Sequence, residues 1–176
     1  MAEDRKNAEN YLRKGKFAYD TKVVTFGSFQ DEDGEERPLE WNVLHVSGGH
    51  FLLMCTDIVA YRPFHDREDL TTWKRCSLRK WLNEDFFSAA FDRGEQAMID
   101  EVETDDGVED RIFLLSKEES EDFFGMLEGY ACGEVYWLRS EMRGNAYVVS
   151  RGGMIDHRRK DHSDTGVLPV MWVNLN

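Results

Sequence analysis

Proline and cysteine are scarce in this chain, with three of each among 176 residues. The cysteines, Cys55, Cys76 and Cys132, are widely spaced and odd in number, which favours reduced, buried thiols over a disulfide framework or a zinc site. No apolar run approaches the ~20 residues that a membrane-spanning helix needs. The charged beginning of the chain contains no apolar stretch typical of a signal peptide. We therefore expect a cytoplasmic protein, or a secreted one if the chain is a trimmed fragment.

Positive charge is also in deficit, because 22 Lys and Arg face 35 Asp and Glu, for a net charge of −13. Sequence-independent binding of nucleic acid needs a positive surface, so this class of function is excluded. The deficit is uneven. Residues 61–82 carry six basic and three acidic side chains, and residues 137–176 carry six and four. These two basic islands either form salt bridges to the acidic body or flank a site for an anionic or polar ligand.

Large apolar side chains are plentiful, since 41% of the residues are hydrophobic and 12% are aromatic. Each large side chain that is fully buried contributes roughly 1.5–3 kcal/mol, so a stable core is expected and disorder is not. The length suits one domain with a sizeable core. We assign residues 1–20 to a polar helix or arm and residues 21–176 to a single domain.

The first half of the chain predicts a three-stranded meander followed by a helix. Alternating apolar residues and turn signals indicate strands over 23–29, 39–46 and 51–55. The helix is expected to begin at Ser77 as its N-cap, because four apolar residues then share one face. These are Leu78, Trp81, Leu82 and Phe86. A short amphipathic piece is expected around residues 95–102.

The second half predicts more strands around one further helix. Ser116 and Glu119 match a capping box that opens a helix to about Leu127. Strands are expected over 111–115, 135–140, 146–150, 154–157 and 167–175. A hairpin turns at Gly152 and Gly153, and the polar run 158–165 is interpreted as a loop. This order of strands and helices favours an α+β domain.

Several segments together resemble a known bacterial family. They are FGSF (26–29), LEWNVL (39–44), YRPF (61–64), Trp73, SLRKWLN (77–83), Ala90, Phe91, IFLLS (112–116), WLRS (137–140) and GVLPVMWV (166–173). The ordered set is similar to the domain-of-unknown-function family 6273, from about residue 23 to residue 175. That resemblance implies a C-type-lectin-like fold, shared with the sulfatase-modifying, formylglycine-generating enzymes. Such a fold has mixed and antiparallel sheets, here with two main helices, and a long loop region that presents ligand-binding residues.

The chain departs from this family pattern in the segment expected to face a ligand. Leu168 stands where the family usually has Arg, and Glu141 with Met142 replaces a Pro-Gly-like turn. Calcium-dependent sugar binding is disfavoured, because the neighbours of the three prolines offer few of the oxygen ligands that Ca²⁺ requires. Formylglycine-generating chemistry is also disfavoured, because Cys132 is the last cysteine and no late pair follows.

The preferred function is therefore a non-catalytic ligand-binding or protein-interaction module, with no cofactor expected. Its partner would be a protein or a polar small molecule or glycan. The predicted ligand-binding residues are Arg62, Trp73, Trp137, Arg139, Asn145, Tyr147, His157, Arg158 and Arg159. Each has a structural alternative, because aromatic residues on strands are commonly core and a buried arginine must pair with a carboxylate. For Arg139, that carboxylate is expected from an acidic loop.

The alternative function is an enzyme of unknown reaction. In it, His157 and His162 would bind a metal ion with Asp161, within the 156–164 loop. A solvated basic loop explains the same residues without chemistry. No nucleophile elbow and no glycine-rich phosphate loop occur in the sequence.

Overall fold

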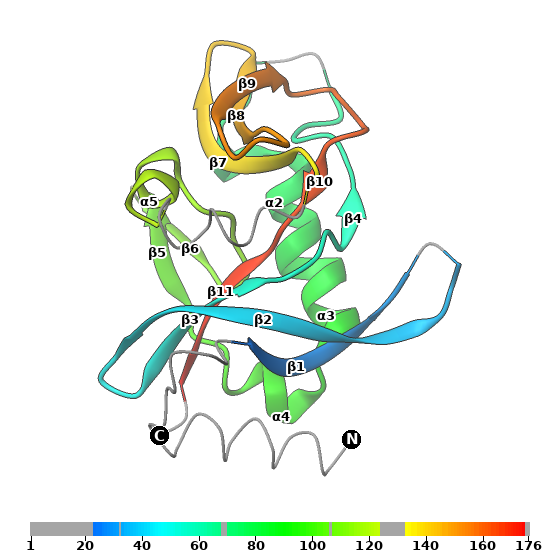
Figure 1. Ribbon diagram of the computed structural model, residues 1–176, viewed down its shortest axis with the longest axis vertical. Helices are drawn as coiled ribbons and strands as arrows, with labels where there is room; N and C mark the ends of the chain where they lie inside the picture. Colours follow the sequence, from blue (N-terminus) through cyan, green and yellow to red (C-terminus); the bar gives the residue numbers. More distant parts are fainter. Residues whose placement is uncertain (1–22, 32, 68–69, 106, 124–132, 175–176) are drawn as a thin grey trace.

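The computed structural model describes residues 23–31, 33–67, 70–105, 107–123 and 133–174. The polar arm predicted for residues 1–20 lies outside them. The described chain is mostly β, with mainly antiparallel sheets and a few short helices (Figure 1). The α+β class is therefore confirmed at this coarse level.

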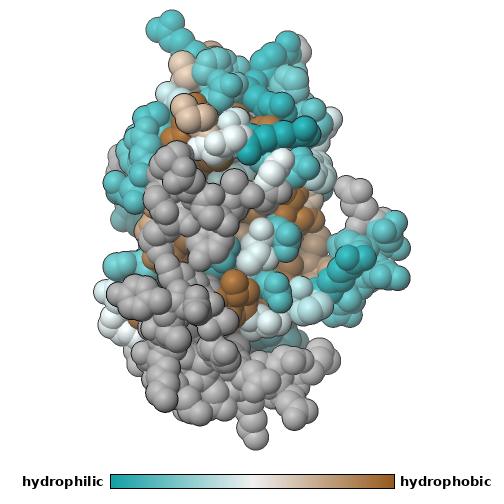
Figure 2. Space-filling model, viewed as in Figure 1, coloured by the Kyte–Doolittle hydropathy of each residue, from teal (hydrophilic) through white to brown (hydrophobic). Residues whose placement is uncertain are grey.

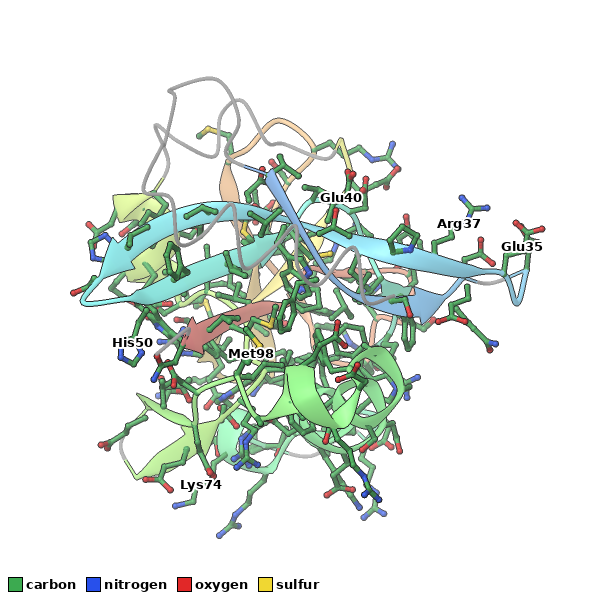
Figure 3. All side chains as sticks on the ribbon, turned by 90° about the horizontal axis from the view of Figure 1, so that it is seen from below. Glu35, Arg37, Glu40, His50, Lys74 and Met98 are labelled. Atoms are coloured by element: carbon green, nitrogen blue, oxygen red, sulfur yellow. The ribbon has the colours of Figure 1, made fainter. Side chains whose placement is uncertain are left out.

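The first sheet contains the predicted meander. Its four strands lie in the order β1 (Val23–Gln30), β2 (Glu36–Ser47), β3 (His50–Cys55) and β11 (Val170–Asn174). All neighbouring strands are antiparallel. In this order, the first and last described strands occupy the two edges of one sheet. Trp41 is fully buried in it and donates from Nε1 to the carbonyl of Phe26 at 2.7 Å. Glu35 and Arg37 stand at the outer end of the β1–β2 hairpin (Figure 3).

The second sheet is built mainly from the last third of the chain. Its order is β4 (Ala60–Tyr61), β10 (Gly166–Val167), β7 (Tyr136–Met142), β8 (Asn145–Val149) and β9 (Ile155–Arg159). The predicted hairpin around Gly152 and Gly153 is confirmed as β8–β9. The predicted loop over 158–165 is partly wrong. β9 extends to Arg159, and Lys160 beyond it is only 5% exposed.

The final strand was predicted as one element, but it is divided between the two sheets. Gly166–Val167 pairs in the second sheet and Val170–Asn174 in the first, with Leu168 and Pro169 between them. Proline has no N–H to donate to a ladder, so pairing is interrupted there, and the Pro169 carbonyl instead accepts from Cys55 N–H at 2.9 Å. The chain thus links the two sheets directly (Figure 1).

Helices lie between and beside the sheets. They are η1 (Trp73–Arg75), α2 (Ser77–Trp81), the π-helical η2 (Leu82–Phe86), α3 (Phe87–Ala90), α4 (Arg93–Gln96) and α5 (Lys117–Asp122). The helix predicted at Ser77 is present, but its N-cap is Cys76, because the Ser77 hydroxyl accepts from Asp66 N–H instead. A β-carbon at Gly27 would lie 2.6 Å from the Ala90 carbonyl oxygen, so the β1–α3 contact requires glycine.

The remaining predictions are met in part. The capping box of α5 is confirmed, with Ser116 Oγ accepting from Glu119 N–H and the Glu119 carboxylate accepting from Ser116 N–H. Its predicted end at Leu127 lies outside the described residues. The strand predicted over 111–115 forms only one bridge, between Phe113 and Val170, and β5 (Val102–Asp105) with β6 (Val108–Asp110) forms a separate hairpin before it.

Candidate functional site

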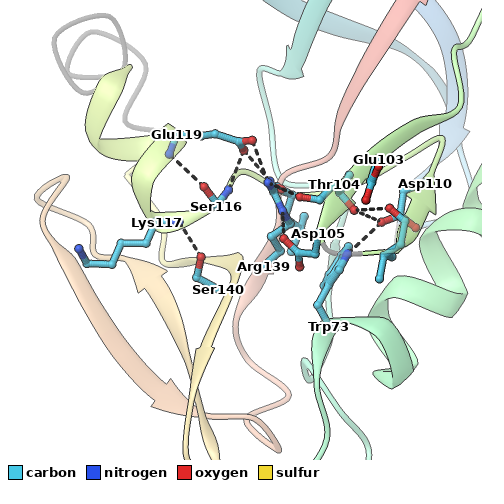
Figure 4. Close-up of polar contacts among 12 residues, drawn as sticks. Trp73, Glu103, Thr104, Asp105, Asp110, Ser116, Lys117, Glu119, Arg139 and Ser140 are labelled. Atoms are coloured by element: carbon cyan, nitrogen blue, oxygen red, sulfur yellow. Dashed lines mark hydrogen bonds and ion pairs between the residues drawn. The ribbon is translucent and has the colours of Figure 1, made fainter.

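Arg139 lies at the centre of a buried polar network (Figure 4). Its guanidinium forms ion pairs with Glu119 of α5 and Asp105 of β5. It also donates to the carbonyls of Leu114 at 2.7 Å and Thr104 at 3.0 Å. With a second bond to Glu119, these contacts use all five of its N–H donors. Arg139 is therefore an internal clamp to carboxylates, and it has no donor left for a ligand.

The clamp is fully ionised. Burial by itself lowers the pKa of the Arg139 guanidinium, but the hydrogen bonds and charges of Glu119 and Asp105 outweigh burial and raise it. The same pairs connect β7 to α5 and to the β5–β6 hairpin. Arg139 therefore holds together the β5–β6 hairpin, α5 and β7, which follow one another in the order of described elements.

Trp73 belongs to the same interior. Its side chain is 2% exposed, and Nε1 donates to Asp110 Oδ2 at 2.9 Å. Asp110 also accepts from Arg79 Nε at 2.6 Å and from Thr104 Oγ1 at 2.7 Å. Trp73 is therefore a core residue and offers no surface to a ligand.

Trp137 and Arg62 contact each other through a hydrogen bond, and Trp137 does not line an open surface. Trp137 is 1% exposed, packs edge-on against Phe64, and donates from Nε1 to the Arg62 carbonyl at 2.8 Å. The Arg62 guanidinium lies over the Trp81 ring, 4.7 Å from its centroid. The position of Trp137 excludes the stacking role predicted for it, whereas Arg62 remains exposed at the surface.

Four of the five remaining predicted residues gather on one face of the β8–β9 hairpin. Asn145 pairs with Arg159 and Tyr147 pairs with His157 across the two strands. Side chains alternate between the faces of a strand, so these four share a face and Arg158 projects from the opposite one. The Arg158 guanidinium there donates to Thr165 Oγ1 at 3.0 Å and to Asp164 at 3.4 Å.

A cleft of about 480 Å³ opens at the end of this face. Its lining residues are Arg67, Leu70, Arg143, Gly144, Asn145, Arg159, Lys160 and Asp161. Four of these side chains are cationic and one is anionic, in a chain with a net charge of −13. Figure 2 shows mostly hydrophilic side chains over this upper part of the molecule. The described lining of the cleft is therefore net positive, as the basic islands predict.

Two of the four cations are already paired. Arg159 forms two bonds to Asp161, at 3.1 and 2.6 Å, and the bond from Arg159 holds the pKa of Asp161 below its usual range. Buried Lys160 donates to the Thr71 carbonyl and to Glu141 Oε2 at 3.2 Å. Lys160 thereby ties residues 70–72 to the end of β9.

Arg67 and Arg143 are the two cations that remain available. Neither has a hydrogen bond or an ion pair to another residue in the part of the chain that the structure describes. Leu70 beside them is 86% exposed. All three residues fall outside the site predicted from the sequence, although Arg67 belongs to the first basic island and Arg143 precedes the β7–β8 turn at Gly144. Only the fold brings the two islands together at one cleft.

A second hollow, of about 340 Å³, has the opposite charge. Its lining residues are His45, Leu52, Val102, Glu103, Thr104, Phe113, Glu119, Asp122, Phe123 and Trp172. Three carboxylates line it, so it would repel the anionic ligand that the sequence predicts. The basic cleft is thus the candidate site.

The metal-binding alternative receives no geometric support. Among the described residues, no group of three or more His, Cys, Asp and Glu side chains could hold a metal ion. Asp161 is engaged by Arg159, His162 Nδ1 lies 3.4 Å from Asp164, and His157 Nδ1 lies 3.4 Å from Asn145 Nδ2.

Two thiols, of Cys55 and Cys76, are free and buried. Burial raises the pKa of each to about 12. Because the thiolate is the reactive form, burial keeps both thiols in the less reactive protonated state near neutral pH.

These thiols predict a specific loss of stability in base. Their unfolded pKa is near 9.0, so the stabilisation from keeping them protonated is complete below that pH and is lost as the pH rises toward about 12. The difference in unfolding free energy between the wild type and a Cys55→Ala/Cys76→Ala variant should shrink by at most ~1.4 kcal/mol per thiol for each pH unit above 9.0. Urea unfolding across this range measures it, and equal pH slopes for the two proteins would contradict it.

Within the described residues, no helix has the length and apolar character needed to cross a membrane. In comparisons with known proteins, the model of a family described as Domain of unknown function (DUF6273) matches residues 48–175. No curated protein and no solved structure matches the chain.

Proposed function

The chain belongs to the domain-of-unknown-function family DUF6273, and from this premise we propose that it is a non-catalytic binding module whose basic cleft holds an anionic group of its partner. The observation that carries the proposal is the pair of guanidiniums, Arg67 and Arg143, that line one cleft without a protein partner among the described residues. A planar guanidinium binds carboxylate and phosphate oxygens through paired hydrogen bonds. Asn145 adds an amide at the same wall.

The charge of the whole chain makes this cleft selective. A net charge of −13 repels anions at long range, so an anion is held only where cations gather. Arg67 comes from the first basic island and Arg143 from the second, and Lys160 joins the two segments through Thr71. The internal pair Arg159–Asp161 supports the wall without offering a free charge.

The lining residues also favour binding over catalysis. Asp161 is the only carboxylate among the described lining residues, and Arg159 holds its pKa below the ordinary value. A general base works best with a pKa near the operating pH, which this carboxylate lacks. Lys160 is buried and donates to Thr71 and Glu141, so it is not poised as a nucleophile.

A C-type-lectin-like scaffold, a bacterial source and a cytoplasmic location also remain proposals. The antiparallel sheet and the mixed sheet support the scaffold, because the resemblance implies sheets of both kinds. The free thiols of Cys55 and Cys76 support a reducing compartment.

The cleft predicts that small polyanions bind at Arg67 and Arg143, the two lining cations without a partner among the described residues. Citrate and pyrophosphate, used as probes, should shift the side-chain Nε–H signals of Arg67 and Arg143 in an NMR titration. An Arg67→Gln/Arg143→Gln variant should bind each probe about tenfold more weakly or worse, a loss of ~1.4 kcal/mol or more.

A matched control removes the same charge elsewhere. Arg75 and Arg93 are exposed and lie outside the cleft, so Arg75→Gln/Arg93→Gln should leave the affinity within about twofold. If both double variants lost affinity equally, or if citrate caused no shift at either cleft arginine, the proposed site would be wrong.

A further inference from the structure

β9 is the outer strand of the five-stranded sheet, on the outside of the molecule (Figure 1). Among the described strands, none pairs with its far side. An edge strand of this kind presents backbone N–H and C=O groups that another chain can pair with. Asp156, His157 and Arg159 of this strand are exposed, so the strand lies at the surface of the molecule.

The register shows which backbone groups point outward. Ser150 N–H donates to Met154 C=O at 2.8 Å, and Lys160 N–H donates to Gly144 C=O at 3.2 Å. The pairing between these two bonds is continuous, and bonded and non-bonded pairs alternate in an antiparallel ladder. The backbone groups of the odd-numbered residues therefore point away from β8. These residues are Ile155, His157 and Arg159.

The open edge ends at the basic cleft. The Arg159 carbonyl accepts from His162 N–H at 3.2 Å, and the Lys160 carbonyl accepts from His65 N–H at 3.0 Å. A chain paired along Ile155 and His157 would therefore stop at this closed end. Arg159, which lines the cleft, is the last residue of the strand, so the chain would end close to the cleft wall.

One side chain already covers part of this edge. Asp156 Oδ1 accepts from the outward His157 N–H at 2.8 Å. Charged side chains on edge strands oppose unwanted pairing with other chains. An incoming strand must displace this carboxylate, so Asp156 lowers the affinity of the edge for any added strand.

We propose that the partner is an extended acidic peptide segment that adds to β9 as a sixth strand and places carboxylates against Arg67 and Arg143. The proposal rests on the function proposed above and names its ligand class. A peptide supplies backbone groups for the edge, carboxylates for the free guanidiniums and apolar side chains for exposed Leu70. A small anion would satisfy only the guanidiniums.

Backbone methylation tests the strand pairing. The probe is a fluorescent peptide of about eight alternating Glu and Val residues, somewhat longer than a typical strand of ~5–6 residues. Two further peptides carry N-methyl groups on all Glu or on all Val residues. Because only alternate N–H groups of an added strand face β9, one methylated peptide should bind about tenfold more weakly than the other.

Two substitutions of Asp156 give a second measurement. Asp156→Ala removes both the charge and the acceptor that covers His157 N–H, whereas Asp156→Asn removes the charge and keeps an acceptor. The alanine variant should bind the unmethylated peptide severalfold more tightly than the asparagine variant. Asp156 is exposed on the edge strand, so neither substitution is expected to unfold the domain.

The outcomes separate this proposal from the one on which it rests. Equal binding of both methylated peptides, or peptide failure while citrate still shifts Arg67 and Arg143, would overturn the added strand and leave the anion cleft standing. Failure of both citrate and peptide would overturn both proposals. Unequal binding of the two methylated peptides would support the added strand. If the Arg67→Gln/Arg143→Gln variant also lost binding of the tighter of the two, both proposals would be supported.

Discussion

Replacing Trp137 with alanine is expected to lower the free energy of unfolding by about 3–5 kcal/mol, the range for large aromatic residues deleted from a core. Trp137 is 1% exposed, its ring packs 5.8 Å from that of Phe64, and its indole N–H is bonded to the Arg62 carbonyl. The substitution leaves a cavity and also removes the donor to the partly buried Arg62 carbonyl. Urea unfolding followed by circular dichroism measures the change.

Trp137→Phe is the matched control for this prediction. It keeps most of the volume and removes the donor to the partly buried Arg62 carbonyl, so it should cost only about 1 kcal/mol, the lower end of the penalty for an unsatisfied group. A Trp137→Ala variant as stable as the wild type would show that the residue faces an open site, as our sequence analysis first proposed. The two variants therefore decide between core and ligand contact.

Replacing Arg139 with alanine is expected to cost about 3 kcal/mol, the lower end of the ~3–5 kcal/mol lost when a buried ion pair is broken. The lower end applies because Glu119 and Asp105 are 38% and 43% exposed, so water can reach their carboxylates once the arginine is gone. The carbonyls of Leu114 and Thr104 lose their donor in the same step. Thermal and urea unfolding both measure the effect.

Arg158→Ala provides the comparison for Arg139. Arg158 pairs with Asp164, which is 73% exposed, and surface pairs of this kind contribute only ~0–1 kcal/mol. The two arginines carry the same charge in the same sheet, so burial is the main difference between them. Equal destabilisation by both substitutions would contradict the clamp.

The local pattern of the chain predicted much of its secondary structure. The capping box at Ser116 and Glu119 is confirmed because two residues three apart complete it without help from the rest of the fold. The helical face with Leu78, Leu82 and Phe86 is buried, as its spacing predicts. The β8–β9 hairpin follows from a glycine pair between two apolar runs.

Predictions that required distant neighbours were less successful. Residues 111–115 have the apolar character of a strand, but Phe113 finds only a single bridge to Val170. Trp73, Trp137 and Arg139 have the residue types of a binding surface, yet all three are buried. The sequence could not distinguish the two roles, because aromatic rings and guanidiniums serve equally in a core and at a site.

The sequence alone determined the net charge of −13, the two basic islands, the short-range caps and turns, and membership of the family whose model matches residues 48–175. The tertiary structure alone decided which cations are free. It buried Lys160 against Thr71 and Glu141, and it brought Arg67 and Arg143 to one cleft from segments far apart in the chain. The physical reason is that caps and turns depend on residues a few positions apart, whereas the pairing of a charge depends on neighbours that only folding brings within a few ångströms.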